Sequence, residues 1–188
     1  MQTPAIRAFF DEPTNTVSYL VWDPATKRGA VVDPVLDWDN RSGEADTAFA
    51  DRILAAAAEE GVRIEYVLET HAHADHLTAA PYIKAKTGAP IGIGEHIQDV
   101  QRIFRPVFDA RDMKPEGGDF DRLFRDGERF PLGSLEVEVM HVPGHTPADI
   151  AYKIVAPEAR GDQVSDVFVG DTLFMHDYGT ARADFPGG

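Results

Sequence analysis

The chain has 188 residues, 43% of them hydrophobic, and its 32 acidic against 18 basic residues give a formal net charge of −14. The length favours one domain spanning residues 1–188. The negative net charge repels phosphate backbones and anionic lipids, so we expect no nucleic-acid and no membrane partner. The absence of cysteine excludes disulfides and thiolate ligands, and without a signal-peptide pattern or an apolar run near the ~20 residues of a membrane span we expect a cytoplasmic protein.

The first half of the chain predicts strands followed by a helix. Strands are expected over residues 5–10, 16–22 and 30–33, where β-branched and aromatic residues gather. Residues 36–43, rich in Asp and Asn, are expected to form a loop. The clearest helix covers residues 45–60, because its apolar residues recur at helical spacing and Gly61 follows as a stop signal.

The second half alternates strands and helices. Helices are predicted over residues 77–87 and 95–109, loops over 111–120 and 178–188, and strands over 63–69, 91–94, 135–142, 150–155 and 167–169. This order favours an α/β fold in which one sheet packs on another and helices lie outside.

Residues 71–76, His-Ala-His-Ala-Asp-His, form a histidine cluster directly after the predicted strand 63–69. Imidazole nitrogens and carboxylate oxygens are ligands of divalent transition metals, and a short loop can direct several of them at one point. His71 and His73 are two residues apart and would share one side of an extended segment, while Asp75 and His76 follow where the chain turns. The alternative is a solvated polar loop without a ligand.

Two further metal-capable residues lie at strand-to-loop junctions, where α/β folds place their chemistry. His145 stands in the turn Pro-Gly-His-Thr-Pro, and Asp171 follows an apolar strand and a glycine. A turn histidine bonded to a carbonyl and a carboxylate that caps a turn are the alternatives. Asp33 could approach the same site or cap a loop. Arg182, near Tyr178, could hold a substrate carboxylate by a bidentate pair or lie free in solvent.

The remaining histidines are weaker candidates. His96 is expected at the surface as a helix-capping residue, His141 as a packed strand residue, and His176 near a pocket.

His-Ala-His-Ala-Asp-His, Pro-Gly-His-Thr and Gly-Asp, in this order, resemble the metallo-β-lactamase superfamily. The resemblance implies an αββα sandwich with a metal site at one edge of its sheets. In binuclear members the corresponding residues would be His71, His73 and His145 on one metal, Asp75 and His76 on a second, and Asp171 between them. Those members also use a late histidine in a segment that this sequence does not reach, so we expect the C-terminal part of the fold to be missing from this chain.

Within that superfamily, the segments at 170–174 and 179–185, which include Arg-Ala-Asp-Phe, resemble the persulfide dioxygenases. This resemblance implies one iron(II) held by His71, His145 and Asp171, with His73, Asp75 and His76 orienting ligands and water. Two imidazoles and one carboxylate form a facial triad that leaves iron positions open for sulfur and O2. The arginine of that segment, Arg182, would contact the thiol carrier, commonly glutathione. Tyr178 is expected to bind the substrate together with Arg182. A cysteine of that branch is absent here.

We therefore expect a metalloenzyme that binds Fe²⁺ and oxidises glutathione persulfide to sulfite with O2. The alternative is a zinc-dependent thioester hydrolase of the glyoxalase II type or another hydrolase of the superfamily, with Zn²⁺ lowering the pKa of a bound water. Asp75 and His76 are the expected catalytic residues, Asp75 as base or water-orienting group. A third reading is a scaffold that binds a metal or partner without catalysis. The sequence leaves open whether the chain forms a homodimer.

Overall fold

The computed structural model describes residues 3–155, 164–174 and 178–180. Strands β1 (Ala5–Asp11), β2 (Thr16–Trp22) and β3 (Arg28–Val32) form an antiparallel meander, and β6 (Arg63–Leu68), β8 (Ile91–Gly94) and β9 (Arg122–Phe124) extend it in parallel from β3. The resulting sheet has the order β1-β2-β3-β6-β8-β9. Its central strands are mostly apolar towards their C-terminal ends, where both of their faces are covered.

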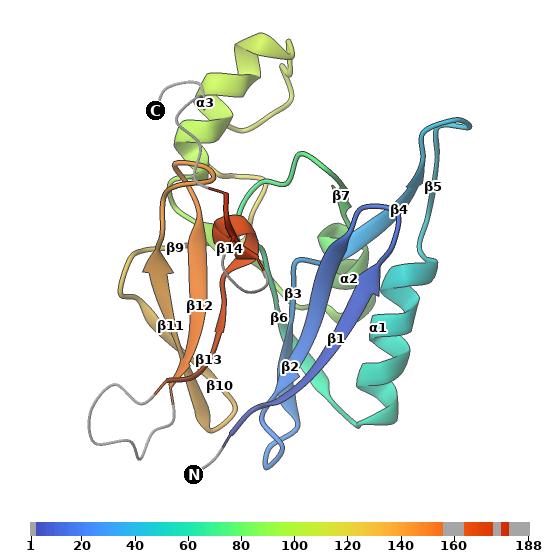
Figure 1. The fold of residues 1–188 in the computed structure, drawn as a ribbon, viewed down its shortest axis with the longest axis vertical. Coiled ribbons are helices and arrows are strands. Elements are labelled where there is room, and N and C mark those ends of the chain that lie inside the picture. Colours follow the sequence, from blue (N-terminus) through green and yellow to red (C-terminus); the bar gives the residue numbers. More distant parts are fainter. Residues whose placement is uncertain (1–2, 156–163, 175–177, 181–188) are drawn as a thin grey trace.

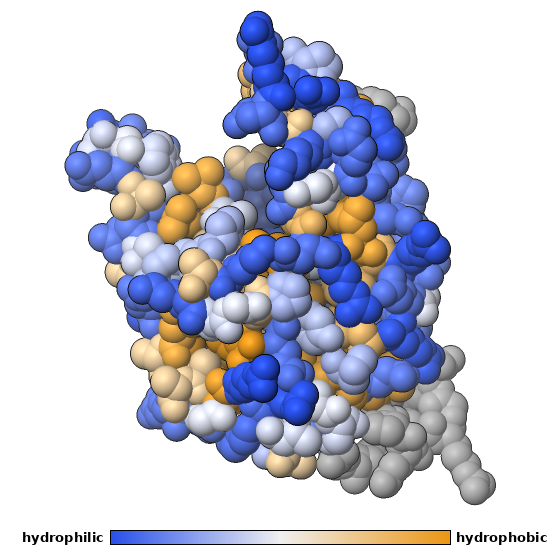
Figure 2. Space-filling view, turned by 180° about the vertical axis from the view of Figure 1, so that it is seen from behind, coloured by the Kyte–Doolittle hydropathy of each residue, from blue (hydrophilic) through white to orange (hydrophobic). Residues whose placement is uncertain are grey.

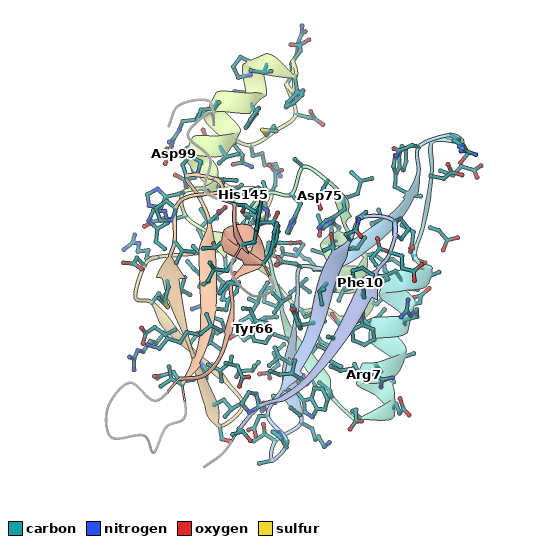
Figure 3. The ribbon with its side chains drawn as sticks, in the orientation of Figure 1. Arg7, Phe10, Tyr66, Asp75, Asp99 and His145 are labelled. Carbon is teal, nitrogen blue, oxygen red and sulfur yellow. The ribbon has the colours of Figure 1, made fainter. Side chains whose placement is uncertain are left out.

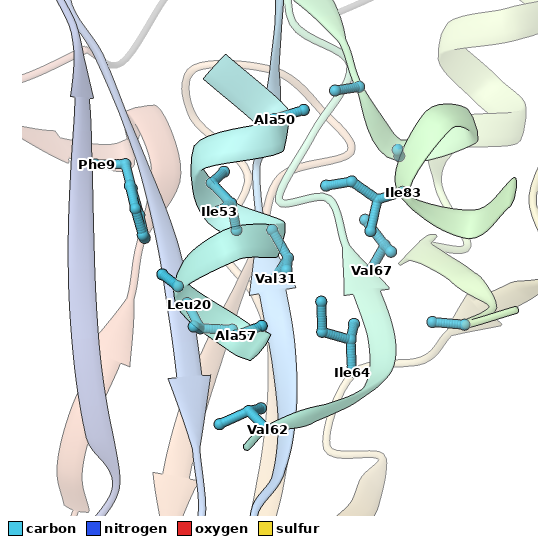
Figure 4. Packing of buried hydrophobic residues seen from close by; sticks show 14 of the residues in the cluster. Phe9, Leu20, Val31, Ala50, Ile53, Ala57, Val62, Ile64, Val67 and Ile83 are labelled. Atoms are coloured by element: carbon cyan, nitrogen blue, oxygen red, sulfur yellow. The ribbon is translucent and has the colours of Figure 1, made fainter. Parts of the chain in front are cut away.

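Two helices cover the outer face of this sheet, α1 (Ala48–Glu59) and α2 (Ala80–Thr87) (Figure 1). Ile53 and Ala57 of α1 point at Leu20 and Val31 of the sheet, and all four are buried (Figure 4). The amide of Ala48 is capped by Asp46 at 2.8 Å, which satisfies a free donor of the first turn. This apolar face, more than intrinsic helix propensity, stabilises α1 on the sheet.

A second sheet packs against the inner face of the first. It consists of β10 (Arg129–Leu132), β11 (Leu135–His141), β12 (Ile150–Val155) and β13 (Val164–Phe168), in this order and all antiparallel. Apolar residues alternate along β11, so that Leu135, Val137 and Val139 are buried in the core between the sheets with Tyr152. Side chains from the two sheets interdigitate there as in other sandwiches.

The opposite face of β11 is polar. Glu136 lies 2.8 Å from Arg129, which also pairs with Glu138, and Lys153 lies 3.3 Å from Glu138. In the described part of the chain, no helix lies over this outer face, whereas α3 (Ile97–Val107) packs at the end of the sandwich beside β8 and β9 (Figure 1). The described residues thus supply the helix layer on one side of the two sheets.

The predicted loop at residues 36–43 is wrong, because β4 (Val35–Asp39) and β5 (Glu44–Asp46) form a projecting hairpin there. The side chain of Asp39 accepts the amide of Arg41 at 2.7 Å, and Gly43 has a φ of +72°, so the polar residues build the turn of a hairpin. Pairing of β7 (Leu77–Thr78) with β4 delays α2 to Ala80. Strands β9 and β10 were also missed, since each is short.

The end of the described chain contains a 3₁₀ turn (Gly170–Thr172) and the short pair β14 (Leu173–Phe174) and β15 (Tyr178–Gly179). The loop predicted over 178–188 therefore starts with a short strand, and residues 181–188 lie outside the described ranges. Hydrophilic residues cover much of the rear face, with hydrophobic residues in small areas between them (Figure 2). Among the helices of the described ranges, none combines the length and the apolar character that a bilayer crossing requires.

Candidate metal centre

The candidate site begins where two parallel strands of the first sheet end. Asp33 follows β3, and Glu69, Thr70 and His71 follow β6. The amide of Asp33 donates to the carbonyl of Leu68 at 2.9 Å, so both strand ends meet at one edge. Such an edge is where open α/β sheets place their ligands.

The second sheet brings its own residues to this edge. His145 lies in the loop between β11 and β12, and Asp171 lies in the 3₁₀ turn after β13. The amide of Ile150, the first residue of β12, donates to the carbonyl of Thr70 at 3.0 Å. Figure 3 shows His145 and Asp75 at the same end of the sandwich, above the gap between the sheets. The histidine cluster and the two later junctions therefore meet in space.

His71, His145 and Asp171 form the first group. Each offers a ligand atom within 4.8 Å of the other two. Nε2 of His145 lies 3.5 Å and Nε2 of His71 lies 4.0 Å from Oδ2 of Asp171. Nε2 of His71 is buried and has no hydrogen-bond partner among the described residues. A buried nitrogen without a partner is costly unless something else binds it, and a divalent cation between the three residues would do so.

The charge state of His71 suits a ligand. Burial, and then the neighbouring His73, lower the pKa of His71 to about 3, so its imidazole is neutral at pH 7. Burial also raises the pKa of Asp171, with a contribution from the charge of Asp75. A bound cation acts in the opposite sense and favours the carboxylate. The group therefore offers two imidazoles and one carboxylate to a metal.

His73, although in the cluster, is engaged elsewhere. Its Nε2 lies 3.2 Å from Oδ1 of Asp33 and 3.3 Å from Oε2 of Glu69, and all three side chains are buried. Burial alone would lower the pKa of His73, but these two carboxylates raise it well above its usual value. Burial raises the pKa of Glu69, which also accepts the hydroxyl of Thr78. These three residues could themselves hold a metal ion.

Asp75 and His76 lie on the outer side of His73. Their ligand atoms and that of His73 fall within 4.8 Å of one another, so the three form a further group that could hold a cation. Asp75 accepts the hydroxyl of Thr16 at 3.3 Å, and Nδ1 of His76 lies 3.0 Å from the carbonyl of Leu77. Nε2 of His76 is buried and has no partner in the described ranges. Both predicted catalytic residues therefore belong to a metal-capable group.

Two supporting residues escaped the sequence analysis. Glu69 is an acidic residue at the end of an apolar strand, which was a usable signal. Asp149 is buried and accepts the amide of Thr146 at 2.9 Å and its hydroxyl at 2.5 Å. Its signal is the pair Thr146 and Asp149, three residues apart. Asp149 thereby fixes the loop that carries His145.

Of the two predicted substrate residues, only Tyr178 lies in the described part of the chain. Tyr178 is 70% exposed, and Arg182 and His176 lie outside the described residues. His96 and His141 stack on each other with ring centroids 4.4 Å apart. Nε2 of His141 lies 2.9 Å from the carbonyl of Pro147 and Nδ1 of His96 lies 3.2 Å from Asp99, so neither joins the site.

Two clefts open on the site. One of about 420 Å³ is lined by Asp171, His73 and Asp75 together with Leu173 and Phe174. The other, of about 680 Å³, lies between His76 and the β4–β5 hairpin, and carboxylates line much of it. Both are within the range of small-molecule sites.

Comparison with known proteins places these features in a family. A sequence model of the metallo-beta-lactamase superfamily matches residues 11–188. A beta-lactamase hydrolase-like protein of Xylella fastidiosa is 47% identical over 188 residues, which are 100% of this chain and 42% of that protein. A probable metallo-hydrolase of Burkholderia pseudomallei is 48% identical over 185 residues, which are 97% of this chain and 63% of that protein.

Among solved structures, ETHE1 from Myxococcus xanthus matches with a TM-score of 0.64 and 27% identity, over 90% of this chain and 58% of that one. The chain thus spans between 42% and 63% of the length of the three proteins named.

Proposed function

The chain belongs to the metallo-β-lactamase superfamily, and from that membership we propose that it is an iron-dependent persulfide dioxygenase. The reaction converts R-S-SH, O2 and H2O into R-SH, sulfite and two protons, so the outer sulfur is oxidised and O2 is reduced. Glutathione is the proposed carrier R-SH. The observation that carries the proposal is the convergence of two imidazoles and one carboxylate, His71, His145 and Asp171.

This donor set suits one iron with open positions. Iron(II) bound there would supply sites for a sulfur anion and for O2. The three residues contribute one negative charge, so the site with Fe²⁺ stays cationic and attracts an anionic persulfide. His71 is buried while the side chain of Asp171 is 31% exposed, so the group is held from inside and open on the side of Asp171.

In the one-metal arrangement that we propose, His73 supports the site from behind through Asp33 and Glu69. The ring of His73 lies beside that of His71, with centroids 4.1 Å apart, while its Nε2 faces Asp33 and Glu69. Both carboxylates are buried, and removing His73 from them would leave two buried negative charges without their common partner. His73 therefore stabilises the frame behind His71 in our proposal, and Asp75 and His76 orient water and substrate at the rim.

Substrate access follows from the cleft beside Asp171. Leu173 and Phe174 line it and are 59% and 48% exposed. An apolar wall beside a metal suits the carbon–sulfur part of a persulfide, whose terminal sulfur would point at the cation. Arg182 and Tyr178 stay proposed contacts of the carrier.

A zinc-dependent thioester hydrolase is the second candidate. It is favoured by the group formed by His73, Asp75 and His76, whose ligand atoms lie within 4.8 Å of one another and could hold a second cation. The Burkholderia relative is called a probable metallo-hydrolase. In this reading Asp75 would act as base for a metal-bound water, the pKa of which a zinc lowers towards ~7.

Metal analysis and two assays test the proposal. We expect the purified chain to hold one iron and to consume O2 in the presence of glutathione persulfide, with sulfite as product. Two zinc ions per chain, cleavage of a glutathione thioester and no O2 uptake would instead establish the hydrolase. A chain that binds iron stoichiometrically and performs neither reaction would contradict both candidates.

A further inference from the structure

Thr70 occupies the space between the proposed ligands and the buried carboxylate of Asp33. Thr70 is 1% exposed. Its hydroxyl oxygen lies 2.9 Å from Oδ2 of Asp33 and 2.9 Å from Nδ1 of His71. Its backbone amide donates to Oδ1 of the same carboxylate at 2.7 Å. Asp33 therefore receives two hydrogen bonds from Thr70, and the hydroxyl alone connects Asp33 to a proposed ligand.

The number of protons in this chain of contacts determines the tautomer of His71. An ionised carboxylate only accepts, so the single hydroxyl proton of Thr70 is donated to Asp33. The contact between Thr70 and Nδ1 of His71 then needs a proton from the imidazole, because the hydroxyl has none left. His71 must carry its proton on Nδ1, which leaves a lone pair on Nε2.

Nε2 of His71 is the atom that faces the other ligands. It is buried, lies 4.0 Å from Oδ2 of Asp171 and has no hydrogen-bond partner in the described part of the chain. A free imidazole in water also adopts the tautomer with its proton on Nε2. That tautomer cannot bind a cation through Nε2. The hydroxyl of Thr70 removes this choice.

Thr70 also sets the approach of Asp171. A Cβ atom at Gly170 would lie 2.3 Å from Oγ1 and 2.8 Å from Cβ of Thr70, and the φ of Gly170 is +51°. The turn that carries Asp171 therefore rests directly on the side chain of Thr70. The carbonyl of Thr70 accepts the amide of Ile150 at 3.0 Å. Thr70, at the end of β6 in the first sheet, thus contacts two segments of the second sheet, the turn with Asp171 and the start of β12.

We propose that Thr70 is a positioning residue, which holds His71 in the Nδ1–H tautomer and sets the distance between His71 and Asp171. The inference rests on the ligand set of the proposed function and does not depend on whether iron or zinc is bound. It predicts that the hydroxyl matters beyond its volume, because outer hydrogen-bond partners of metal ligands typically change metal affinity 10–100-fold.

The test uses Thr70→Val, which keeps the volume and loses the hydroxyl, and Thr70→Ser, which keeps the hydroxyl. Thr87→Val is the matched control, because the Thr87 hydroxyl bonds to Ile83 in α2, away from the site. Ring nitrogen NMR of the metal-free proteins reports the tautomer of His71, and calorimetric titration with Zn²⁺ or Co²⁺ reports affinity. We expect Nδ1–H and full affinity in the unchanged protein, Thr70→Ser and the control, and an affinity roughly 10–100-fold weaker in Thr70→Val.

Either measurement can overturn the inference. An unchanged protein whose metal-free His71 carries its proton on Nε2 refutes it, and this result does not depend on any variant folding. A folded Thr70→Val with unaltered tautomer and affinity refutes it too. Absence of O2 consumption by the iron-loaded protein would count against the dioxygenase but leave both of these measurements unchanged.

Discussion

The amide of Ile150 donates a hydrogen bond to the carbonyl of Thr70 at 3.0 Å, and this bond joins the two sheets at the candidate metal centre. Ile150 starts β12 of the second sheet, and Thr70 follows β6 of the first. The segments that carry His71 and His145 are therefore tied by the backbone itself. Groups on such a frame keep their separation better than groups on free loops.

The proposed ligand set predicts a sharp division among the histidines. His71→Ala, His145→Ala and Asp171→Ala should each abolish stoichiometric binding of Fe²⁺ or Zn²⁺, because each removes one of three ligands. His96→Ala is the matched control, since His96 is exposed and pairs with Asp99. Elemental analysis of the folded variants checks this. Full occupancy in any of the first three would exclude that residue as a ligand.

Asp149 should affect metal binding without touching the metal. Asp149→Ala removes the acceptor of the Thr146 amide and hydroxyl, and hydrogen bonds to a charged group contribute roughly 1.5–3 kcal/mol each. We expect a loss of about 2–4 kcal/mol in the free energy of unfolding and weaker metal binding. Asp126→Ala, which removes an exposed acceptor of the His141 amide, is the control and should cost about 1 kcal/mol or less. Equal losses in urea denaturation would contradict the role given to Asp149.

Gly170→Ala should disturb the site through Thr70. The added Cβ meets buried atoms of Thr70 at 2.3 and 2.8 Å, and the positive φ adds strain of roughly 1–3 kcal/mol. We expect lower stability and weaker metal binding, measured by denaturation and by titration. At Gly179 a Cβ would have only ordinary contacts, at 3.6 Å or more. Gly179→Ala should therefore leave both quantities nearly unchanged, and parallel losses in the two variants would refute the explanation.

Asp23 should contribute a pH-dependent part of the stability at the opposite end of the sandwich. Burial alone would raise its pKa, but hydrogen bonds from Ser134, Thr26 and Ala25 lower it to about 2. Because the folded-state pKa lies below the unfolded value, the contribution is complete above about pH 4 and is lost as the pH falls towards 2. It amounts to about 2 kcal/mol.

The measurement compares the unchanged protein with Asp23→Asn in urea denaturation at several pH values. The difference between their free energies of unfolding should shrink by about 2 kcal/mol between pH 6 and pH 2. A difference that stays constant over this range would show that the carboxyl of Asp23 has no lowered pKa.

The sequence predicted the main strands, α1 and the residues that converge at the site. His71, His145 and Asp171 could be found because each directly follows a strand and stands in a distinctive local pattern. The surroundings of His73 could not, since Asp33 lies 40 positions earlier in the chain and no local pattern connects them. The β4–β5 hairpin was missed because Asp and Asn side chains, which build its turn, were read as signs of an irregular loop.

The tie between Thr70 and Ile150 has a kinetic consequence. Residues 33, 70, 150 and 171 come together only when both sheets are formed and docked, and such distant contacts form late in folding. A metal held on this frame by His71, His145 and Asp171 binds the native state and little of what precedes it. Its binding energy should therefore lower the rate of unfolding and leave the rate of folding almost unaltered.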